Sequence, residues 1–149
     1  MKPRLYPFQR EGVEHYHKHD GIVLNADDMG LGKTLQTLTY WHETPEAKPR
    51  LVVCPASLKT NWAVEARKFY GMDSAILETT RPTIYKSYRS RDLLIINYEI
   101  LGPWLTFLRS LNLQNLCLDE GQMIAGINSA RTKNSKILAR GVPHRQILT

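Results

Sequence analysis

The chain has 149 residues, of which 42% are hydrophobic and 9% aromatic, and it carries a formal charge of +6 at pH 7. This size and composition suit one folded domain and exclude an intrinsically disordered protein. With no run of 18 apolar residues and no apolar stretch behind its basic start, the sequence predicts neither a membrane span nor a signal peptide. We therefore expect an intracellular location (cytoplasm or nucleoid in a prokaryote or phage, nucleus in a eukaryote). The basic balance favours a polyanionic partner such as nucleic acid.

Short apolar runs alternate with segments of helical periodicity along the chain. The predicted strands are residues 22–25, 51–54, 74–77, 93–96, 115–118 and 146–148. The predicted helices are residues 7–18, 33–42, 57–70, 99–110 and 130–139. The second and fourth strands lack alternation between apolar and polar residues, which is typical of strands buried on both faces of a parallel sheet. We therefore expect a doubly wound α/β fold, a mainly parallel sheet with helices on both faces.

The two cysteines, Cys54 and Cys117, both lie within apolar runs. This placement predicts buried free thiols on strands. A disulfide is the alternative, but nothing in the sequence indicates an oxidising compartment.

A glycine-rich loop follows the first predicted strand and precedes the second predicted helix. Its sequence is Ala26-Asp27-Asp28-Met29-Gly30-Leu31-Gly32-Lys33-Thr34. Strand, glycine loop and helix form the context of a phosphate-binding loop, in which glycines let backbone N–H groups approach phosphate oxygens. Lys33 would reach the β- and γ-phosphates, and the Thr34 hydroxyl would bind Mg²⁺. The strict pattern G-x-x-x-x-G-K-[ST] is not met because Asp27 stands at its first glycine, so a chance glycine-rich turn is the alternative.

Two adjacent carboxylates, Asp119 and Glu120, end the fifth predicted strand about 85 residues after Lys33. Phosphoryl transfer needs a carboxylate to hold Mg²⁺ and a group to orient or deprotonate the attacking water. Asp119 would serve the metal and Glu120 the water. The alternative is that the pair caps the start of a helix.

Five ordered motifs, and the run into a sixth, resemble those of one family. They are residues 5–13 (LYPFQREGV), 27–34 (DDMGLGKT), 51–58 (LVVCPASL), 96–99 (INYE) and 118–122 (LDEGQ), followed by 144–149. The chain is similar to the first RecA-like lobe of the Swi/Snf-type ATPases, which are DNA translocases of helicase superfamily 2. An acidic residue commonly replaces the first glycine of the phosphate loop in that family, which accounts for Asp27.

The resemblance implies a RecA-like P-loop NTPase lobe over residues 1–149, ending before a second lobe. It implies that the intact protein hydrolyses ATP with Mg²⁺ and moves along double-stranded DNA by sequence-independent backbone contacts, with no membrane partner. In the family the second lobe, of the same or a companion chain, supplies arginines that complete the ATP site. Because arginine fingers are worth about 10³–10⁵ in rate, we expect residues 1–149 alone to bind nucleotide weakly and hydrolyse it negligibly.

The resemblance also implies roles for residues outside the loop and the acidic pair. Besides Lys33 and Thr34, the loop residues implied to bind the nucleotide are Asp28, Met29, Gly30, Leu31 and Gly32. Those implied to lie beside the DNA backbone are Pro55, Ser57, Lys59, Asn97 and Tyr98. Amides, hydroxyls and backbone N–H groups hold phosphate without reading sequence. The alternative for Ser57 is an ordinary N-cap of the next helix.

Three further residues have a functional and a structural interpretation. Gln9 is implied to bind the adenine edge, since an amide offers both a donor and an acceptor. An exposed polar residue at a helix start is the alternative for Gln9. Trp62 and Phe69 lie seven residues apart on one helical face, which favours core residues over base-stacking platforms.

Two departures from the family pattern fall next to the acidic pair. Gln122 stands where the family has a histidine that is thought to couple the nucleotide site to the DNA-contacting motifs. Glutamine can hydrogen-bond but cannot carry a proton charge near neutral pH, so we expect hydrolysis to persist with altered coupling. Gly121 in place of alanine adds backbone freedom.

Two other functions remain open from the sequence. One is a nucleotide- and DNA-binding module with little hydrolysis, because of Gln122 and the absence of a second lobe. The other is a small-molecule kinase of the phosphate-loop type, which would lack an evident acceptor-site lid and would not explain the motif around Gln9. Stimulation by DNA would separate the translocase from both.

Overall fold

A six-stranded parallel sheet forms the centre of the fold. The computed structural model describes residues 2–27, 32–126 and 128–149. The strands are β1 (Val23–Asn25), β2 (Arg50–Cys54), β3 (Ser74–Ile76), β4 (Leu93–Asn97), β5 (Asn115–Leu118) and β6 (His144–Leu148). Their order across the sheet is β1-β6-β5-β2-β4-β3, and each of the five neighbouring pairs is parallel. The predicted parallel sheet is therefore confirmed.

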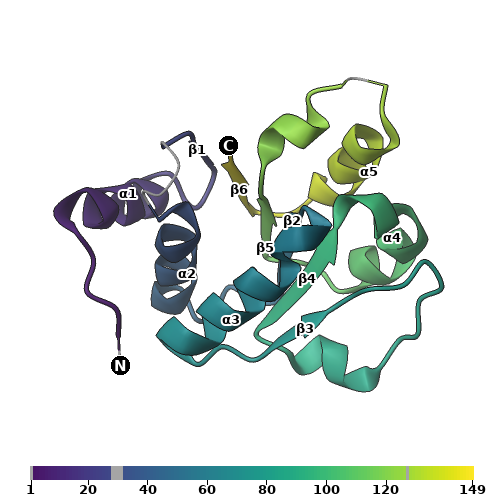
Figure 1. Cartoon of the computed structure of the whole chain (residues 1–149), viewed down its shortest axis with the longest axis horizontal. Coiled ribbons are helices and arrows are strands. Elements are labelled where there is room, and N and C mark those ends of the chain that lie inside the picture. The colour runs from purple at the N-terminus through teal and green to yellow at the C-terminus, as the bar shows by residue number, and fades with distance from the viewer. Residues whose placement is uncertain (1, 28–31, 127) are drawn as a thin grey trace.

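Helices cover both faces of this sheet. The α-helices are α1 (Pro7–Lys18), α2 (Lys33–Glu43), α3 (Lys59–Tyr70), α4 (Leu101–Ser110) and α5 (Ala130–Ala139). Short 3₁₀ helices are η1 (Ala56–Leu58), η2 (Lys86–Ser90), η3 (Tyr98–Ile100) and η4 (Gly121–Ile124). Figure 1 shows α1, α2 and α3 on one side of the sheet and α4 and α5 on the other. Among the described residues, none of these helices is long and apolar enough to cross a membrane.

The uninterrupted apolar run of β2, residues 51–54, is explained by a separate core on each face. Leu51 and Val53 pack in the core beneath α4 and α5, which includes Trp104. Val52 and Cys54 point the opposite way, into the core beneath α1, α2 and α3. Because successive side chains of a strand point to opposite faces, a strand with helices on both sides needs apolar residues at every position.

The cysteines lie inside the core, as predicted. Cys54 and Cys117 are both free and buried. Burial raises the pKa of the Cys54 thiol to about 12, and it raises the pKa of Cys117 as well. Both thiols therefore stay protonated and act as small apolar side chains.

Candidate nucleotide site at the carboxyl edge of the sheet

The predicted catalytic residues meet in one cavity. A hollow of about 400 Å³ opens between the start of α2, one face of α3 and the end of β5. Its lining consists of Gly32, Lys33, Thr34, Leu35, Leu58, Asn61, Trp62, Glu65, Phe69, Asp119 and Glu120. Parallel sheets bind ligands at this edge because the loops after the strands converge there. Of the predicted loop residues, Asp28, Met29, Gly30 and Leu31 lie outside the described residues.

Lys33 is the first residue of α2, and the N-terminus of this helix, with its positive potential, borders the cavity. Its ammonium donates hydrogen bonds to the backbone carbonyl of Asp27 at 2.7 Å and to that of Thr149 at 2.6 Å. The lysine is thus held beside the cavity by the end of β1 on one side and the end of β6 on the other. A phosphate that binds Lys33 would replace these carbonyl groups.

Asp119 presents a buried carboxylate to the same cavity, with 8% of the residue exposed. Its Oδ1 accepts from the backbone N–H of Glu120 at 2.9 Å, and its Oδ2 accepts from the indole N–H of Trp62 at 2.8 Å. Burial raises the pKa of Asp119, and the hydrogen bond from Trp62 opposes this rise. Each carboxylate oxygen can accept more than one bond, so both retain capacity for a further partner.

The donor set around Asp119 fits a magnesium ion. Mg²⁺ prefers oxygen ligands and is commonly bound by one or two carboxylates together with substrate phosphates. The Asp119 carboxylate and the residue Thr34, which carries a hydroxyl, line one cavity with Lys33. These residues could hold Mg²⁺ together with a phosphate.

Glu120 has a left-handed backbone, with φ 53° and ψ 55°. Such a conformation is uncommon for a residue with a side chain, and it concentrates at functional sites. Glu120 precedes η4 but makes no side-chain bond that caps this short helix. The capping interpretation of the acidic pair therefore has no support in the structure.

Gln122 links the acidic pair to the end of β6. Its amide N–H donates to a carboxylate oxygen of Glu120. Its carbonyl accepts from the Thr149 hydroxyl at 3.2 Å. A glutamine, which carries no charge of its own, therefore makes two hydrogen bonds at the position where the family has a titratable histidine. The coupling role of Gln122 stays a prediction.

Gly121 is sterically constrained by β6. A Cβ placed on Gly121 would lie 2.6 Å from Cγ2 of Ile147. We expect Gly121→Ala to lower the free energy of unfolding by about 1–3 kcal/mol, as overpacking does elsewhere. Urea denaturation checks this, with Gly126→Ala as the control, because a Cβ there would lie 3.8 Å from its nearest neighbour. Equal stabilities of the two variants would contradict the constraint.

Gln9 is buried beside the phosphate loop rather than exposed. It is 6% exposed, and its carbonyl accepts from the Tyr6 backbone N–H at 2.9 Å in a capping box at the start of α1. A Cβ on Gly32 would lie 2.5 Å from the Gln9 amide nitrogen. The interpretation of Gln9 as an exposed helix-start residue is therefore wrong. Its role in adenine binding stays a prediction.

The predicted DNA-contacting residues lie at or just beyond the carboxyl ends of β2 and β4, which are neighbours in the sheet, and Asn97 is the last residue of β4. Ser57 is exposed, and Leu58, not Ser57, is the N-cap of α3, so the capping alternative for Ser57 is wrong. The Lys59 ammonium is buried and donates to Asn97 Oδ1 at 2.9 Å. Tyr98 is buried too, and its hydroxyl donates to the Asp119 carbonyl at 2.6 Å. In this structure Lys59 and Tyr98 therefore stabilise the carboxyl edge of the sheet through buried hydrogen bonds, whereas Ser57 presents an exposed hydroxyl.

Trp62, Asn61 and Glu65 line the cavity but were not predicted as site residues. Trp62 is a core residue, as predicted, with 1% exposed, but it also binds Asp119. Phe69, also predicted to be core, is half-buried and lines the cavity. Glu65 lies four residues after Asn61 and three after Trp62, and Phe69 lies seven residues after Trp62. This helical spacing is the sequence signal that places these residues along one side of α3.

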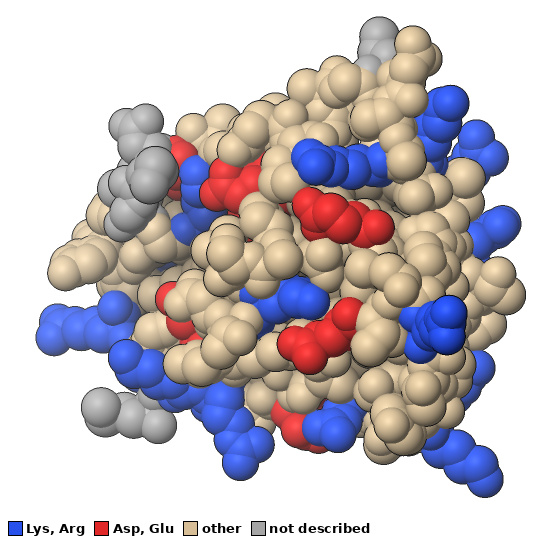
Figure 2. Space-filling model, turned by 45° about the vertical axis from the view of Figure 1, so that its right-hand side comes forward, with Lys and Arg blue, Asp and Glu red and all other residues tan. Residues whose placement is uncertain are grey.

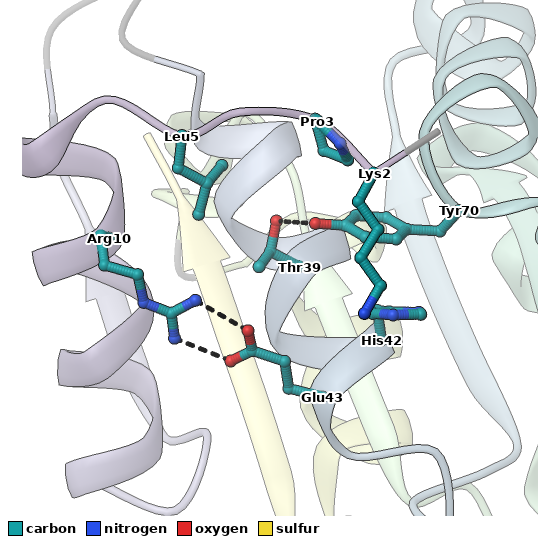
Figure 3. A pocket seen from close by; sticks show the side chains of 8 residues that line it. All are labelled: Lys2, Pro3, Leu5, Arg10, Thr39, His42, Glu43 and Tyr70. Carbon is teal, nitrogen blue, oxygen red and sulfur yellow. Dashed lines mark hydrogen bonds and ion pairs between the residues drawn. The ribbon is translucent and has the colours of Figure 1, made fainter.

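A larger hollow of about 580 Å³ is lined by Arg10 of α1, by the C-terminal half of α2 and by Tyr70 at the end of α3, and it does not contain the predicted catalytic residues. Figure 3 shows its lining, with the Arg10 guanidinium directed at the Glu43 carboxylate. The two N···O distances are 2.7 and 2.8 Å, and His17 Nε2 lies 2.8 Å from the same carboxylate. Because the ion pair between Arg10 and Glu43 joins α1 to α2, we assign this hollow a structural role.

The Glu43 ion pair predicts a specific dependence of stability on pH. Hydrogen bonding from Arg10, with support from His17, lowers the pKa of Glu43 to about 2. A lowered folded-state pKa stabilises the fold above the unfolded value near 4.5, and this contribution is lost as the pH falls toward 2. We expect Glu43→Gln to cost about 1 kcal/mol at pH 7 and much less at about pH 2.5. Denaturation at both pH values checks this, and an equal cost at both would contradict it.

The surface charges are mixed rather than gathered into one block. Figure 2 shows Lys and Arg side chains mainly around the rim of the face in view, with acidic side chains between them. This agrees with the spread of basic residues along the sequence. A polyanion would therefore meet dispersed positive charge on this face.

Comparison with known proteins identifies the family. A sequence model of the SNF2-related domain matches residues 8–149. The chain is 30% identical over 148 residues to a Caenorhabditis elegans homolog of SWI/SNF-related matrix-associated actin-dependent regulator of chromatin subfamily A-like protein 1, covering 98% of this chain and 21% of the relative. It is 30% identical over 140 residues to DNA annealing helicase and endonuclease ZRANB3 of Mus musculus, covering 89% of this chain and 13% of the relative.

Among solved structures, the chain is similar to the Sulfolobus solfataricus SWI2/SNF2 ATPase core in complex with dsDNA. The TM-score is 0.84 and the identity 31%, with 100% of this chain and 32% of that chain covered. The chain thus spans about a fifth or less of the two curated relatives and about a third of the solved core. Because the family match extends over nearly all of the residues, the chain belongs to the SNF2-related domain family and has the fold of its N-terminal RecA-like lobe.

Proposed function

We propose that this chain is the ATP-binding lobe of a DNA-dependent ATPase that translocates on double-stranded DNA. The observation that carries the proposal is the convergence of Lys33 and Thr34 with Asp119 and Glu120 in one cavity. These pairs are about 85 residues apart in the sequence, and their residue types are those that phosphoryl transfer requires. Membership of the SNF2-related family supports the same activity.

Each residue of the cavity has a defined task in this proposal. Lys33 and the N-terminus of α2 bind the phosphates, and Gln9 binds the adenine edge. Thr34 and Asp119 hold Mg²⁺, which neutralises charge on the phosphates when it is bound. Glu120 orients the attacking water and accepts its proton. Gln122 keeps the Glu120 carboxylate in place by hydrogen bonding.

Completion of the site requires a second RecA-like lobe. An arginine from that lobe would stabilise the charge that develops on the phosphates in the transition state. We infer that residues 1–149 bind ATP but turn it over negligibly without it. The non-hydrolysing module is the less favoured alternative, because Glu120 keeps a hydrogen-bonding partner in Gln122.

Double-stranded DNA is the proposed track. The segments after β2 and β4 lie side by side at the carboxyl edge, and Ser57 is exposed there. A formal charge of +6 favours binding to the phosphate backbone. The solved Sulfolobus solfataricus core, with which this chain shares its fold, is in complex with dsDNA.

Fluorescence anisotropy of a labelled duplex tests the DNA assignment. We expect binding that weakens as the salt concentration rises and that does not depend on the duplex sequence. Ser57→Glu should weaken binding about tenfold, because it places a negative charge beside phosphates. Ser87→Glu is the matched control, since Ser87 is also exposed but lies in η2, before the amino end of β4. Absence of duplex binding, or equal effects of the two variants, would contradict the assignment.

A further inference from the structure

Trp62 joins the core to the candidate metal-binding carboxylate. Its ring is buried with 1% of the residue exposed, and it packs against Trp41 with 6.1 Å between ring centroids. Its indole N–H leaves this apolar environment and donates to Asp119 Oδ2 at 2.8 Å. Trp62 also lines the cavity that contains Lys33. A buried indole N–H needs an acceptor, and here that acceptor is the carboxylate at the cavity.

The indole N–H fixes the rotation of the Asp119 carboxylate. The Glu120 backbone N–H holds Oδ1 at 2.9 Å, while Trp62 holds Oδ2 at 2.8 Å. Rotation of the carboxylate about its Cβ–Cγ bond would break both hydrogen bonds at once. A metal ligand that is held by a hydrogen bond to a second residue is oriented for the metal before the metal arrives.

The main chain of Asp119 is held from a different element. The Tyr98 hydroxyl in η3 donates to the Asp119 carbonyl at 2.6 Å, whereas Trp62 belongs to α3. The backbone and the side chain of Asp119 therefore have separate anchors. Removing the indole N–H would leave the carboxylate held only through Oδ1, while the main chain stays in place.

We propose that Trp62 is a positioning residue that orients the Asp119 carboxylate for Mg²⁺ through its indole N–H. This inference rests on the proposed function, because it presupposes that Asp119 binds magnesium with ATP. Trp41 offers a matched comparison. It is equally buried, with 0% exposed, and its indole nitrogen has no hydrogen-bond partner in the described part of the chain.

The test compares Trp62→Phe with Trp41→Phe in the full 149-residue chain. Isothermal titration calorimetry measures ATP affinity with excess Mg²⁺ and again with EDTA. We expect Trp62→Phe to weaken binding about tenfold with Mg²⁺ and not with EDTA, since loss of a partner to a metal ligand typically costs about 10- to 100-fold in metal affinity. Trp41→Phe should leave both affinities unchanged. Thermal denaturation establishes that both variants are folded.

Two results would overturn the inference in distinguishable ways. If Trp62→Phe weakened ATP binding equally with Mg²⁺ and with EDTA, or not at all, the indole N–H would have no positioning role. Wild-type binding that did not respond to Mg²⁺ would overturn the inference and the proposed function together.

Discussion

Replacing Lys33 with alanine should weaken ATP binding about 10- to 100-fold, since one or two charge-assisted hydrogen bonds to phosphate are lost. The fold should persist, because the bonds that the lysine makes to the described residues go to the backbone carbonyls of Asp27 and Thr149 at the margin of the sheet. Isothermal titration calorimetry with MgATP measures the change, and circular dichroism reports whether the variant is folded. Lys133→Ala is the control, because Lys133 is exposed on α5, outside the cavity.

The same experiment distinguishes a phosphate site from general electrostatic attraction. Both variants remove one positive charge, so a non-specific effect would appear in both. Comparable affinities of Lys33→Ala and Lys133→Ala for MgATP would contradict the assignment of the cavity.

Gly32→Ala should be damaging to both stability and nucleotide binding. Gly32 has φ +74°, and a Cβ there would lie 2.5 Å from the Gln9 amide nitrogen. The left-handed conformation costs a residue with a side chain about 1–2 kcal/mol, before any displacement of Gln9. We expect the free energy of unfolding to fall by about 2 kcal/mol and ATP affinity to fall about tenfold.

Denaturation and calorimetry check the two parts of this prediction separately. Gly71→Ala is the control, because Gly71 is also left-handed, with φ +62°, but a Cβ there would meet no described atom within 4 Å. It should lose stability by backbone strain alone and keep its ATP affinity. An equal loss of affinity in both variants would contradict a role for the Gly32–Gln9 contact.

Most of the fold could be predicted from the sequence because its strands are short apolar runs between helical segments. The boundaries of α1 and α5 are as predicted, whereas α3 and α4 begin later than predicted, at Lys59 and Leu101. Each is preceded by a 3₁₀ turn, η1 or η3, which periodicity alone does not distinguish from the first turn of an α-helix.

The convergence of the candidate site was also predictable, but its hydrogen bonds were not. The carboxyl ends of parallel strands share an edge, which puts Lys33 and Asp119 at the same edge of the sheet, and the order β1-β6-β5 then places them near one another. The bond from Trp62 to Asp119 joins residues 57 positions apart, and helical spacing indicates only the face on which Trp62 lies. Similarly, the residue type of Lys59 suggests a phosphate contact, whereas burial against Asn97 depends on packing that the local sequence does not encode.

The most direct test of the central claim is a calorimetric titration of the wild-type chain with ATP, with and without Mg²⁺. We expect saturable binding of one ATP per chain that is weak but strengthened by Mg²⁺, because Lys33, Thr34 and Asp119 line the same cavity. Absence of saturable binding at millimolar ATP, or binding that is indifferent to Mg²⁺, would contradict the assignment of this cavity as a nucleotide site.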